Sequence, residues 1–372
     1  MHSNSSCVGD TPALRSLFSD RSWPEASLAS PSVLEGKTVL VSGAGGSLGR
    51  VLVRALRQRP VRRIVALDAS EHVLVQLQER LGAEAPVDCI LGDVRLPADR
   101  RRALATEPDV VIHAAAYKHV PFLEDRPIPA VKNNLLATID WGRACQEAGV
   151  DQFVLVSTDK AVASTSVMGR TKLWGERWLR RGRAQAAEAI PAGTTVRLCN
   201  LFGSRGSVVP RFLRHLSAGE PLPLTHPDMH RWFMAPTDAS ETILSALAAP
   251  PGTYVPTSCL YVSIVTLARR MVQWAQPDAD PADWIRWVGP RPGERLHETL
   301  WGDDETVERV DERALRRVEA PVSGSLPLPQ RIDALRRACA GGRSEAVHRL
   351  LQVEQPTVSP NGAVSPSEAT TQ

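Results

Sequence analysis

A hydroxyl, an acid and an amine stand side by side at Thr158, Asp159 and Lys160, one residue after the apolar run 153–156. Strands of open α/β sheets present reactive groups at their carboxyl ends, beside a bound cofactor. An adjacent acid and amine could take opposite proton-transfer roles in one catalytic cycle. The chain has only five lysines among 44 basic residues, and lysine can release a proton where arginine cannot. A salt-bridged surface turn is the alternative interpretation.

A glycine-rich turn lies between an apolar run and a stretch with helical periodicity in the amino-terminal third. Gly43, Gly46 and Gly49 would let the backbone turn tightly and approach a pyrophosphate at a helix amino terminus. Asp68 ends the next apolar run, where an acidic residue would bind the adenosine ribose hydroxyls. Since a carboxylate there repels a 2′-phosphate, the pattern favours NAD over NADP. An ordinary strand–helix turn is the alternative.

The elements around these motifs alternate between strand and helix, which predicts an α/β fold: a Rossmann-type doubly wound parallel sheet with a smaller, mostly helical C-terminal substrate lobe. Strands are expected near 37–42, 62–67, 86–91, 109–113, 152–157 and 194–198. Later helices are expected at 210–218, 239–248, 264–274, 329–340 and 344–351. The predicted organisation begins with an amino-terminal arm (1–34), either poorly ordered or an interface segment, with a short helix around 13–18. An NAD-binding domain (35–200), a substrate lobe with some return to the first domain (201–352) and a disordered tail (353–372) follow.

The charge, the cysteine spacing and the apolar runs of the chain narrow the kinds of function that it can have. A net charge of +3 with spread-out basic residues does not indicate nucleic-acid binding. The six cysteines lie far apart without a C-x-x-C pair, and we expect them to be small buried residues rather than disulfides or a metal site. No apolar run has the length of a membrane span, and the first residues lack the pattern of a signal peptide. A cytoplasmic enzyme is therefore expected.

The motifs together resemble one family. They occur in order at 43–49, 92–95, 113–121, 157–162, 167–172, 203–210, 225–227, 231–234 and 289–294. The set is similar to the capsular-polysaccharide-type UDP-N-acetylglucosamine 4,6-dehydratases of the extended short-chain dehydrogenase/reductase superfamily, over roughly residues 35 to 350. Many members carry an amino-terminal bundle of membrane helices, and this chain is expected to be a soluble form that assembles into homo-oligomers.

The resemblance implies two sets of binding residues. For NAD these are the glycine turn around the pyrophosphate, Asp68 at the ribose, two residues at the adenine, a shelf beside the nicotinamide, and Lys172 at its ribose. The full cofactor set is Gly43, Gly45, Gly46, Ser47, Leu48, Gly49, Asp68, Asp93, Val94, Ala114, Ala115, Ala116 and Lys172. For the UDP-sugar the set is Lys118, Asn200, Arg205, Val209 and Arg291.

The resemblance also implies a reaction. Oxidation of C4 by NAD+ would make H5 acidic, water would leave across C5 and C6, and the hydride would return to C6. Lys160 would be the base at C5, Asp159 the acid at O6, and Thr158 a hydrogen-bond donor to the C4 oxygen. A neutral Lys160 requires a lowered pKa, from desolvation or from cations such as Lys172 or the nicotinium ring.

Position 168, four residues before Lys172, holds methionine where the wider superfamily has a catalytic tyrosine. Met168 has no proton chemistry. The chain would then be either inactive as an oxidoreductase or a member of a dehydratase branch with methionine there, and the Thr158–Lys160 set favours the second. Either the carboxylate of Asp159 or a bound water would accept the C4 hydroxyl proton.

Three functions follow. The first is a UDP-N-acetylglucosamine 4,6-dehydratase, yielding UDP-2-acetamido-2,6-dideoxy-4-hexulose. The second is another UDP-sugar-modifying enzyme of the same fold, a 5,6-dehydratase or a 4-epimerase; the epimerase has no need of an acid and a base at C5 and C6. The third is a non-catalytic NAD-binding protein, which only Met168 supports.

Overall fold

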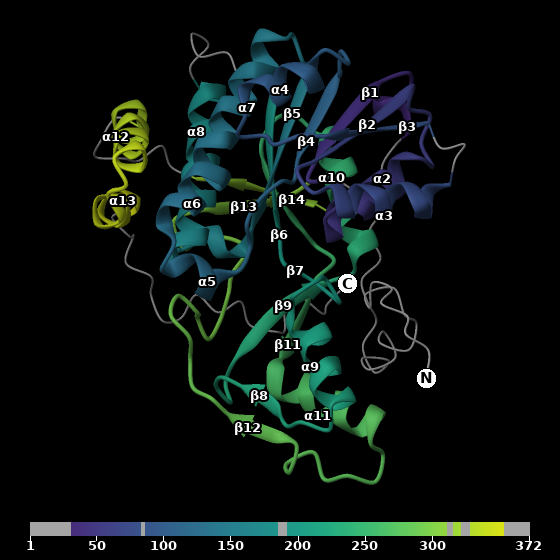
Figure 1. Ribbon diagram of the computed structural model, residues 1–372, viewed down its shortest axis with the longest axis vertical. Coiled ribbons are helices and arrows are strands. Elements are labelled where there is room, and N and C mark those ends of the chain that lie inside the picture. Colours follow the sequence, from purple (N-terminus) through teal and green to yellow (C-terminus); the bar gives the residue numbers. More distant parts are fainter. Residues whose placement is uncertain (1–30, 83–85, 185–191, 311–314, 321–327, 353–372) are drawn as a thin grey trace.

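Alternating strands and helices build a large, mostly parallel sheet in the computed structural model, which describes residues 31–82, 86–184, 192–310, 315–320 and 328–352 (Figure 1). Within these ranges the sheet has nine strands in the order β13-β14-β10-β6-β5-β4-β1-β2-β3. The first six in sequence are β1 (Thr38–Ser42), β2 (Arg63–Asp68), β3 (Val87–Leu91), β4 (Val110–His113), β5 (Gln152–Thr158) and β6 (Ala192–Leu198). These six strands are parallel to one another. Their bounds agree with the predicted ones to within about one or two residues. This order places the topological switch between β1 and β4.

Three later strands return to this sheet from the other part of the chain. β10 (Thr253–Pro256) pairs in parallel with β6, and β14 (Leu315–Glu319) pairs antiparallel with both β10 and β13 (Thr306–Arg309). The edge beyond β6 is therefore built by β10, which lies between two lobe segments in sequence, and by β13 and β14, which follow the lobe.

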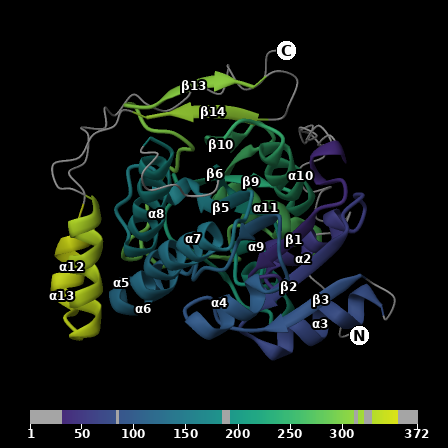
Figure 2. The same cartoon turned by 90° about the horizontal axis from the view of Figure 1, so that it is seen from above.

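Helices cover both faces of the sheet, as the two views show (Figures 1 and 2). One apolar core lies under α2 (Ser47–Leu56), α3 (Glu71–Leu81) and α10 (Pro236–Leu247). The other lies under α4 (Pro97–Leu104), α5 (Val120–Glu124), α6 (Pro127–Val131), a π-helical turn (Lys132–Leu136), α7 (Ala137–Glu147), α8 (Val167–Ala184), α12 (Leu328–Ala340) and α13 (Ser344–Leu351). The doubly wound Rossmann-type fold predicted from the sequence is confirmed.

A smaller lobe packs at the carboxyl ends of the parallel strands, with its own apolar core. It was expected to be mostly helical, but five short strands accompany its helices α9 (Val208–Ser217) and α11 (Ile264–Ala275). They are β7 (Asn200–Leu201), β8 (Leu222–Leu224), β9 (His230–Met234), β11 (Leu260–Ser263) and β12 (Ile285–Trp287), in sheets ordered β11-β9-β7 and β12-β8. Runs of two to five residues are too short to give a reliable alternation of apolar and polar side chains.

The end of the expected amino-terminal arm belongs to the folded part. A 3₁₀ turn spans Pro31–Leu34, and Leu34 packs in the core that includes α2. The helix expected around 13–18 and the tail from 353 lie outside the described residues. Among the helices that the structure describes, none combines the length and apolar character needed to cross a bilayer.

Candidate active site

The Thr158–Lys160 segment is held by a tight turn at the carboxyl end of β5. Thr158 ends the strand, and a 3₁₀ turn spans Asp159–Ala161. The Thr158 hydroxyl donates to Asp159 Oδ1 at 2.8 Å. The turn packs closely on α8 because position 169 is glycine: a Cβ on Gly169 would stand 2.1 Å from the Lys160 carbonyl oxygen. The close packing of this turn on α8 therefore fixes the position of the Lys160 backbone, from which the side chain extends.

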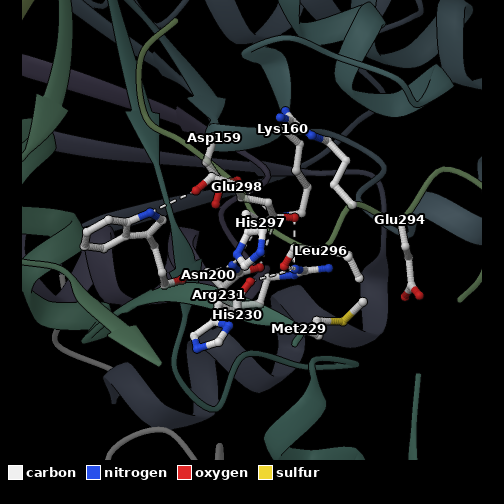
Figure 3. A network of polar contacts seen from close by, with 12 residues as sticks. Asp159, Lys160, Asn200, Met229, His230, Arg231, Glu294, Leu296, His297 and Glu298 are labelled. Carbon is white, nitrogen blue, oxygen red and sulfur yellow. Dashed lines mark hydrogen bonds and ion pairs between the residues drawn. The ribbon is translucent and has the colours of Figure 1, made fainter. Parts of the chain in front are cut away.

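Lys160 belongs to a network of polar contacts (Figure 3). Its Nζ is 3.0 Å from Asp159 Oδ1, 3.0 Å from Asn200 Oδ1 and 3.2 Å from Glu298 Oε2. The Lys160 side chain is 21% exposed, whereas those of Asp159 and Glu298 are 0% and 6% exposed. The acid and the amine that are adjacent in sequence are thus in direct contact, next to a second carboxylate.

Sequence reasoning did not find Glu298, and it gave no role to Arg231. Arg231 Nε is 3.3 Å from Glu298 Oε1, and Asn200 Nδ2 donates to Glu298 Oε2 at 3.3 Å. Glu298 is 138 residues from Lys160 along the chain and outside any described helix or strand. Its only sequence signal was its place four residues after the stretch 289–294.

The electrostatics of the cluster correct one expectation. Burial alone would lower the pKa of Lys160, but the carboxylates of Asp159 and Glu298 outweigh it, and the pKa is raised. Burial and the charge of Glu298 raise the pKa of Asp159 to about 6. Burial opposes ionisation of Glu298, yet Lys160 and Arg231 hold its pKa below the usual range. The pKa is lowered instead at two other lysines of the pocket, mainly by burial: at Lys172 it falls to about 8, and it is also lowered at Lys118.

A pocket of about 1000 Å³ opens beside the cluster and is lined by both the main sheet and the lobe. It brings together most of the residues singled out from the sequence. These are Gly43, Gly46, Ser47, Leu48, Gly49, Ala114, Ala116, Lys118, Thr158, Lys160, Met168, Lys172, Asn200, Arg205 and Arg291. Arg205 sits over the glycine turn, since its backbone N–H donates to Ser47 Oγ at 3.0 Å.

Several predicted residues lie outside the pocket wall. Val209 is fully buried in the lobe core, and the preceding Val208 lines the pocket instead, because successive residues of α9 face different directions. The Asp159 carboxylate lies behind Thr158 and Lys160, with no exposed surface. Gly45 packs against Val73. Neither Gly45 nor Ala115 lines the pocket.

The three residues expected around the adenosine lie at the same edge of the sheet, after β2 and β3. Asp68 ends β2 and accepts the backbone N–H of Gly45 at 3.0 Å. Asp93 is bonded through both carboxylate oxygens to Arg95, which lowers its pKa despite partial burial. Val94 is buried. The neighbouring parallel strands β1, β2 and β3 thus bring all three to the same edge of the sheet, but none of the three lines the pocket.

Met168 and Lys172 stand one turn apart on α8, and both line the pocket. Met168 is 3% exposed, and the Lys172 ammonium donates to the Val156 carbonyl at 2.9 Å. The residue one turn before Lys172 therefore contributes a thioether to the pocket wall, where a tyrosine would contribute a phenol.

Strand order, the glycine turn and a pocket at the carboxyl ends of the strands define a doubly wound, Rossmann-type α/β protein. The family described as "Polysaccharide biosynthesis protein" matches residues 39–320, and the chain belongs to it.

Named relatives of the chain include two kinds of nucleotide-sugar enzyme. The UDP-N-acetylglucosamine 4,6-dehydratase (inverting) of Campylobacter jejuni is 31% identical over 276 residues, covering 73% of this chain and 79% of the relative. A UDP-glucose 4-epimerase of Rickettsia massiliae is 30% identical, covering 77% of this chain and 84% of the relative. The capsular polysaccharide biosynthesis protein CapD of Staphylococcus aureus is 34% identical over 73% of this chain, which spans about half (46%) of that relative.

Solved structures show the same fold. The dTDP-glucose 4,6-dehydratase DesIV of Streptomyces venezuelae, solved with NAD bound, aligns with a TM-score of 0.61 at 21% identity. The alignment covers 70% of this chain and 86% of DesIV.

Proposed function

We propose that this protein is an NAD-dependent nucleotide-sugar 4,6-dehydratase that acts on UDP-N-acetylglucosamine. The observation that carries the proposal is the 3.0 Å hydrogen bond between Lys160 and Asp159 at a strand end that faces a large pocket. A C5 base and a source of the O6 proton are the two groups that this elimination requires. A relative named as a UDP-N-acetylglucosamine 4,6-dehydratase supports the choice of sugar nucleotide.

The residues at the glycine turn fit a dinucleotide. Gly43 has a φ of +73°, and a Cβ there would stand 2.8 Å from the Ala115 backbone, so this turn needs glycine. Asp68 would hold the adenosine ribose, and Lys172 would hold the second ribose beside Met168. When bound, NAD+ would supply the reversible hydride acceptor for C4 and C6.

The proton chemistry follows from one hydrogen bond. Moving a proton from Lys160 Nζ to Asp159 Oδ1 along the 3.0 Å bond gives a neutral amine and a protonated carboxyl. These are the base for C5 and the acid for O6, produced together. The pKa of about 6 at Asp159 favours the protonated form more than an exposed aspartate would. Asp159 is buried and does not reach the sugar itself. Thr158 lines the pocket, and its hydroxyl bonds Asp159 at 2.8 Å. The Thr158 hydroxyl would therefore relay the proton from the Asp159 carboxyl to O6 of the sugar.

The cations of the pocket would bind the diphosphate. Lys118, Arg205 and Arg291 all line it, and arginine is well suited to planar, bidentate phosphate contacts. Their charges would also draw an anionic substrate into the pocket.

The runner-up is a 4-epimerase, because UDP-glucose 4-epimerases are also among the relatives. Epimerisation at C4 uses neither a C5 base nor an O6 acid, so the Lys160–Asp159 pair would have no role in that reaction. A 5,6-dehydratase would keep that pair.

The deciding experiment is incubation of the protein with UDP-N-acetylglucosamine in D2O, followed by proton NMR. We expect a new 6-methyl signal and deuterium at C5, and the C5 coupling reports inversion or retention. A product that keeps its 6-hydroxymethyl group and is altered only at C4 would establish the epimerase instead.

Replacement of Asp68 by alanine tests the cofactor assignment. We expect NAD to bind about tenfold to a hundredfold more weakly, since hydrogen bonds to a charged group are worth about 1.5–3 kcal/mol. Discrimination against NADP should also fall, because the charge that repels a 2′-phosphate is lost. Titration calorimetry with both dinucleotides measures this. Asp88→Ala, on the neighbouring strand, is the control, and an unchanged NAD-to-NADP ratio in Asp68→Ala would count against the assignment.

Replacement of Glu298 by glutamine tests the role of the polar cluster through the pH dependence of kcat/KM. Below the pKa of Asp159, about 6, both Asp159 and Lys160 hold protons, no base remains, and kcat/KM should fall. Glu298 raises the pKa of Asp159 and of Lys160. Both limbs of the pH profile should therefore move to lower pH in Glu298→Gln. The same profile for Glu294→Gln, which bonds the Arg291 backbone instead, should keep its wild-type limbs.

A further inference from the structure

Two cysteines that are 60 residues apart in sequence meet beside the pocket. Cys199 Sγ lies 2.7 Å from Cys259 Sγ. The sequence analysis expected small buried cysteines rather than disulfides, and it did not predict this contact. A spacing of 60 residues carries no motif, so only the fold brings the two thiols together.

The pair lies where the main sheet joins the lobe. Cys199 links β6 to β7, lines the pocket and precedes Asn200. Cys259 directly precedes β11. Strands β7 and β11 flank β9, with Asn200 and Leu260 both paired to Phe233. The two thiols therefore sit at the start of the two strands that hold β9 between them.

Asn200 connects this position to the chemistry. Its Oδ1 accepts from Lys160 Nζ at 3.0 Å, and its Nδ2 donates to the Trp232 carbonyl at 3.0 Å and to Glu298 at 3.3 Å. A shift of Cys199 moves the residue that positions the Lys160 amine against Glu298.

We propose that Cys199 and Cys259 form a reversible disulfide that displaces Asn200 and switches off the Lys160 site. The disulfide and the displacement stand on the geometry alone, and the loss of turnover rests on the proposed dehydratase function. The oxidant is a low-molecular-weight disulfide, such as oxidised glutathione.

The reaction is two successive thiol–disulfide exchanges. The Cys259 thiolate attacks one sulfur of the small disulfide, giving a mixed disulfide and one small thiol after protonation. The Cys199 thiol then loses its proton and attacks the Cys259 sulfur, which releases the second small thiol. Two protein thiols are oxidised by two electrons, and one small disulfide is reduced to two thiols.

The environments of the two cysteines set the order of attack. Cys259 is partly exposed. Cys199 is 6% exposed, and burial together with its contact to Cys259 raises its pKa, so it reacts second. A disulfide requires a separation of about 2.05 Å. The sulfurs must therefore approach, and the Cys199–Asn200 link moves toward β11.

The test uses the full chain, fully reduced and then treated with oxidised glutathione. Peptide mass spectrometry without reductant should find the linked Cys199–Cys259 peptide. Hydrogen–deuterium exchange should change in the segment that contains Asn200. Turnover should fall about 10²-fold, the scale of a 1 Å misplacement in an active site, and dithiothreitol should restore it.

Two variants make the result specific. Cys259→Ser should keep its activity and lose its response to oxidised glutathione, whereas Cys89→Ser, at another partly exposed cysteine on β3, should respond as wild type does. Absence of the linked peptide, or a linked peptide with unchanged exchange at Asn200, would overturn the inference. If the reduced wild type turns over no nucleotide sugar, the proposed function fails, while the linked peptide and the exchange pattern still decide the disulfide.

Discussion

Lys160→Arg is expected to lower turnover by about 10²–10⁴-fold, the usual contribution of a general acid or base, while the protein stays folded and still binds NAD. Arginine keeps a positive charge opposite the buried carboxylates of Asp159 and Glu298, so their pairing survives. It cannot release a proton at working pH. The variant therefore removes the base and leaves the electrostatic balance of the cluster in place.

Lys160→Ala should also abolish water loss and exchange at C5, but it leaves two buried carboxylates close together and will lower stability as well. The measurement is deuterium incorporation at C5 together with bound NAD per chain. Lys132→Arg, at an exposed lysine in the π-helical turn, is the matched control. Near-normal turnover in Lys160→Arg would show that another group removes H5.

Arg197→Met is expected to reduce the free energy of unfolding by about 3–5 kcal/mol, the cost of removing one partner of a buried ion pair. Arg197 is 1% exposed and binds two carboxylates: Glu176 at 3.0 and 2.8 Å, and Glu305 at 2.6 and 2.7 Å. The same Glu176 accepts the Ser157 hydroxyl, so this network also supports the strand end that carries Thr158.

The loss of unfolding free energy in Arg197→Met should depend on pH. Burial would raise the pKa of Glu305, but Arg197 outweighs it and holds that pKa below its usual value. A depressed carboxyl pKa stabilises the fold above the unfolded-state pKa, and this contribution disappears as pH falls through the folded-state value. Arg197→Met should therefore cost most at neutral pH and less in acid.

Urea unfolding of wild type and variant at neutral and acidic pH measures this cost. Arg63→Met removes an exposed ion pair with Asp88 and should cost at most about 1 kcal/mol. Replacing Glu176 and Glu305 by methionine in the Arg197→Met background should recover stability, because apolar groups can replace a buried ionic network. Equal losses for Arg197→Met and Arg63→Met would contradict this account.

The sequence predicted the sheet well because its strands are apolar runs punctuated by a glycine turn and by helices with clear periodicity. β1, β2 and β5 begin and end within about a residue of expectation. Each signal there is local: the residues that define the element are consecutive.

The features that the sequence did not predict depend on contacts between distant segments. The pKa of Lys160 is raised by Asp159, its neighbour in sequence, and by Glu298, 138 residues away. The sequence analysis considered only burial and nearby cations, and it therefore predicted a lowered pKa. The Cys199–Cys259 contact and the burial of Asp159 behind Thr158 likewise exist only once the lobe has packed against β5 and β6.

The return of β10, β13 and β14 to the main sheet has a consequence for synthesis of the chain. A ribosome that has released residues up to about 200 has made β6 but not its neighbour β10 (Thr253–Pro256). Until β10 has been made, the backbone N–H and C=O groups on the outer edge of β6 are unpaired and can pair with another nascent chain. A fragment cut at residue 200 would keep that edge permanently, so we expect it to aggregate, whereas chains that extend past Glu319 can close the sheet by themselves.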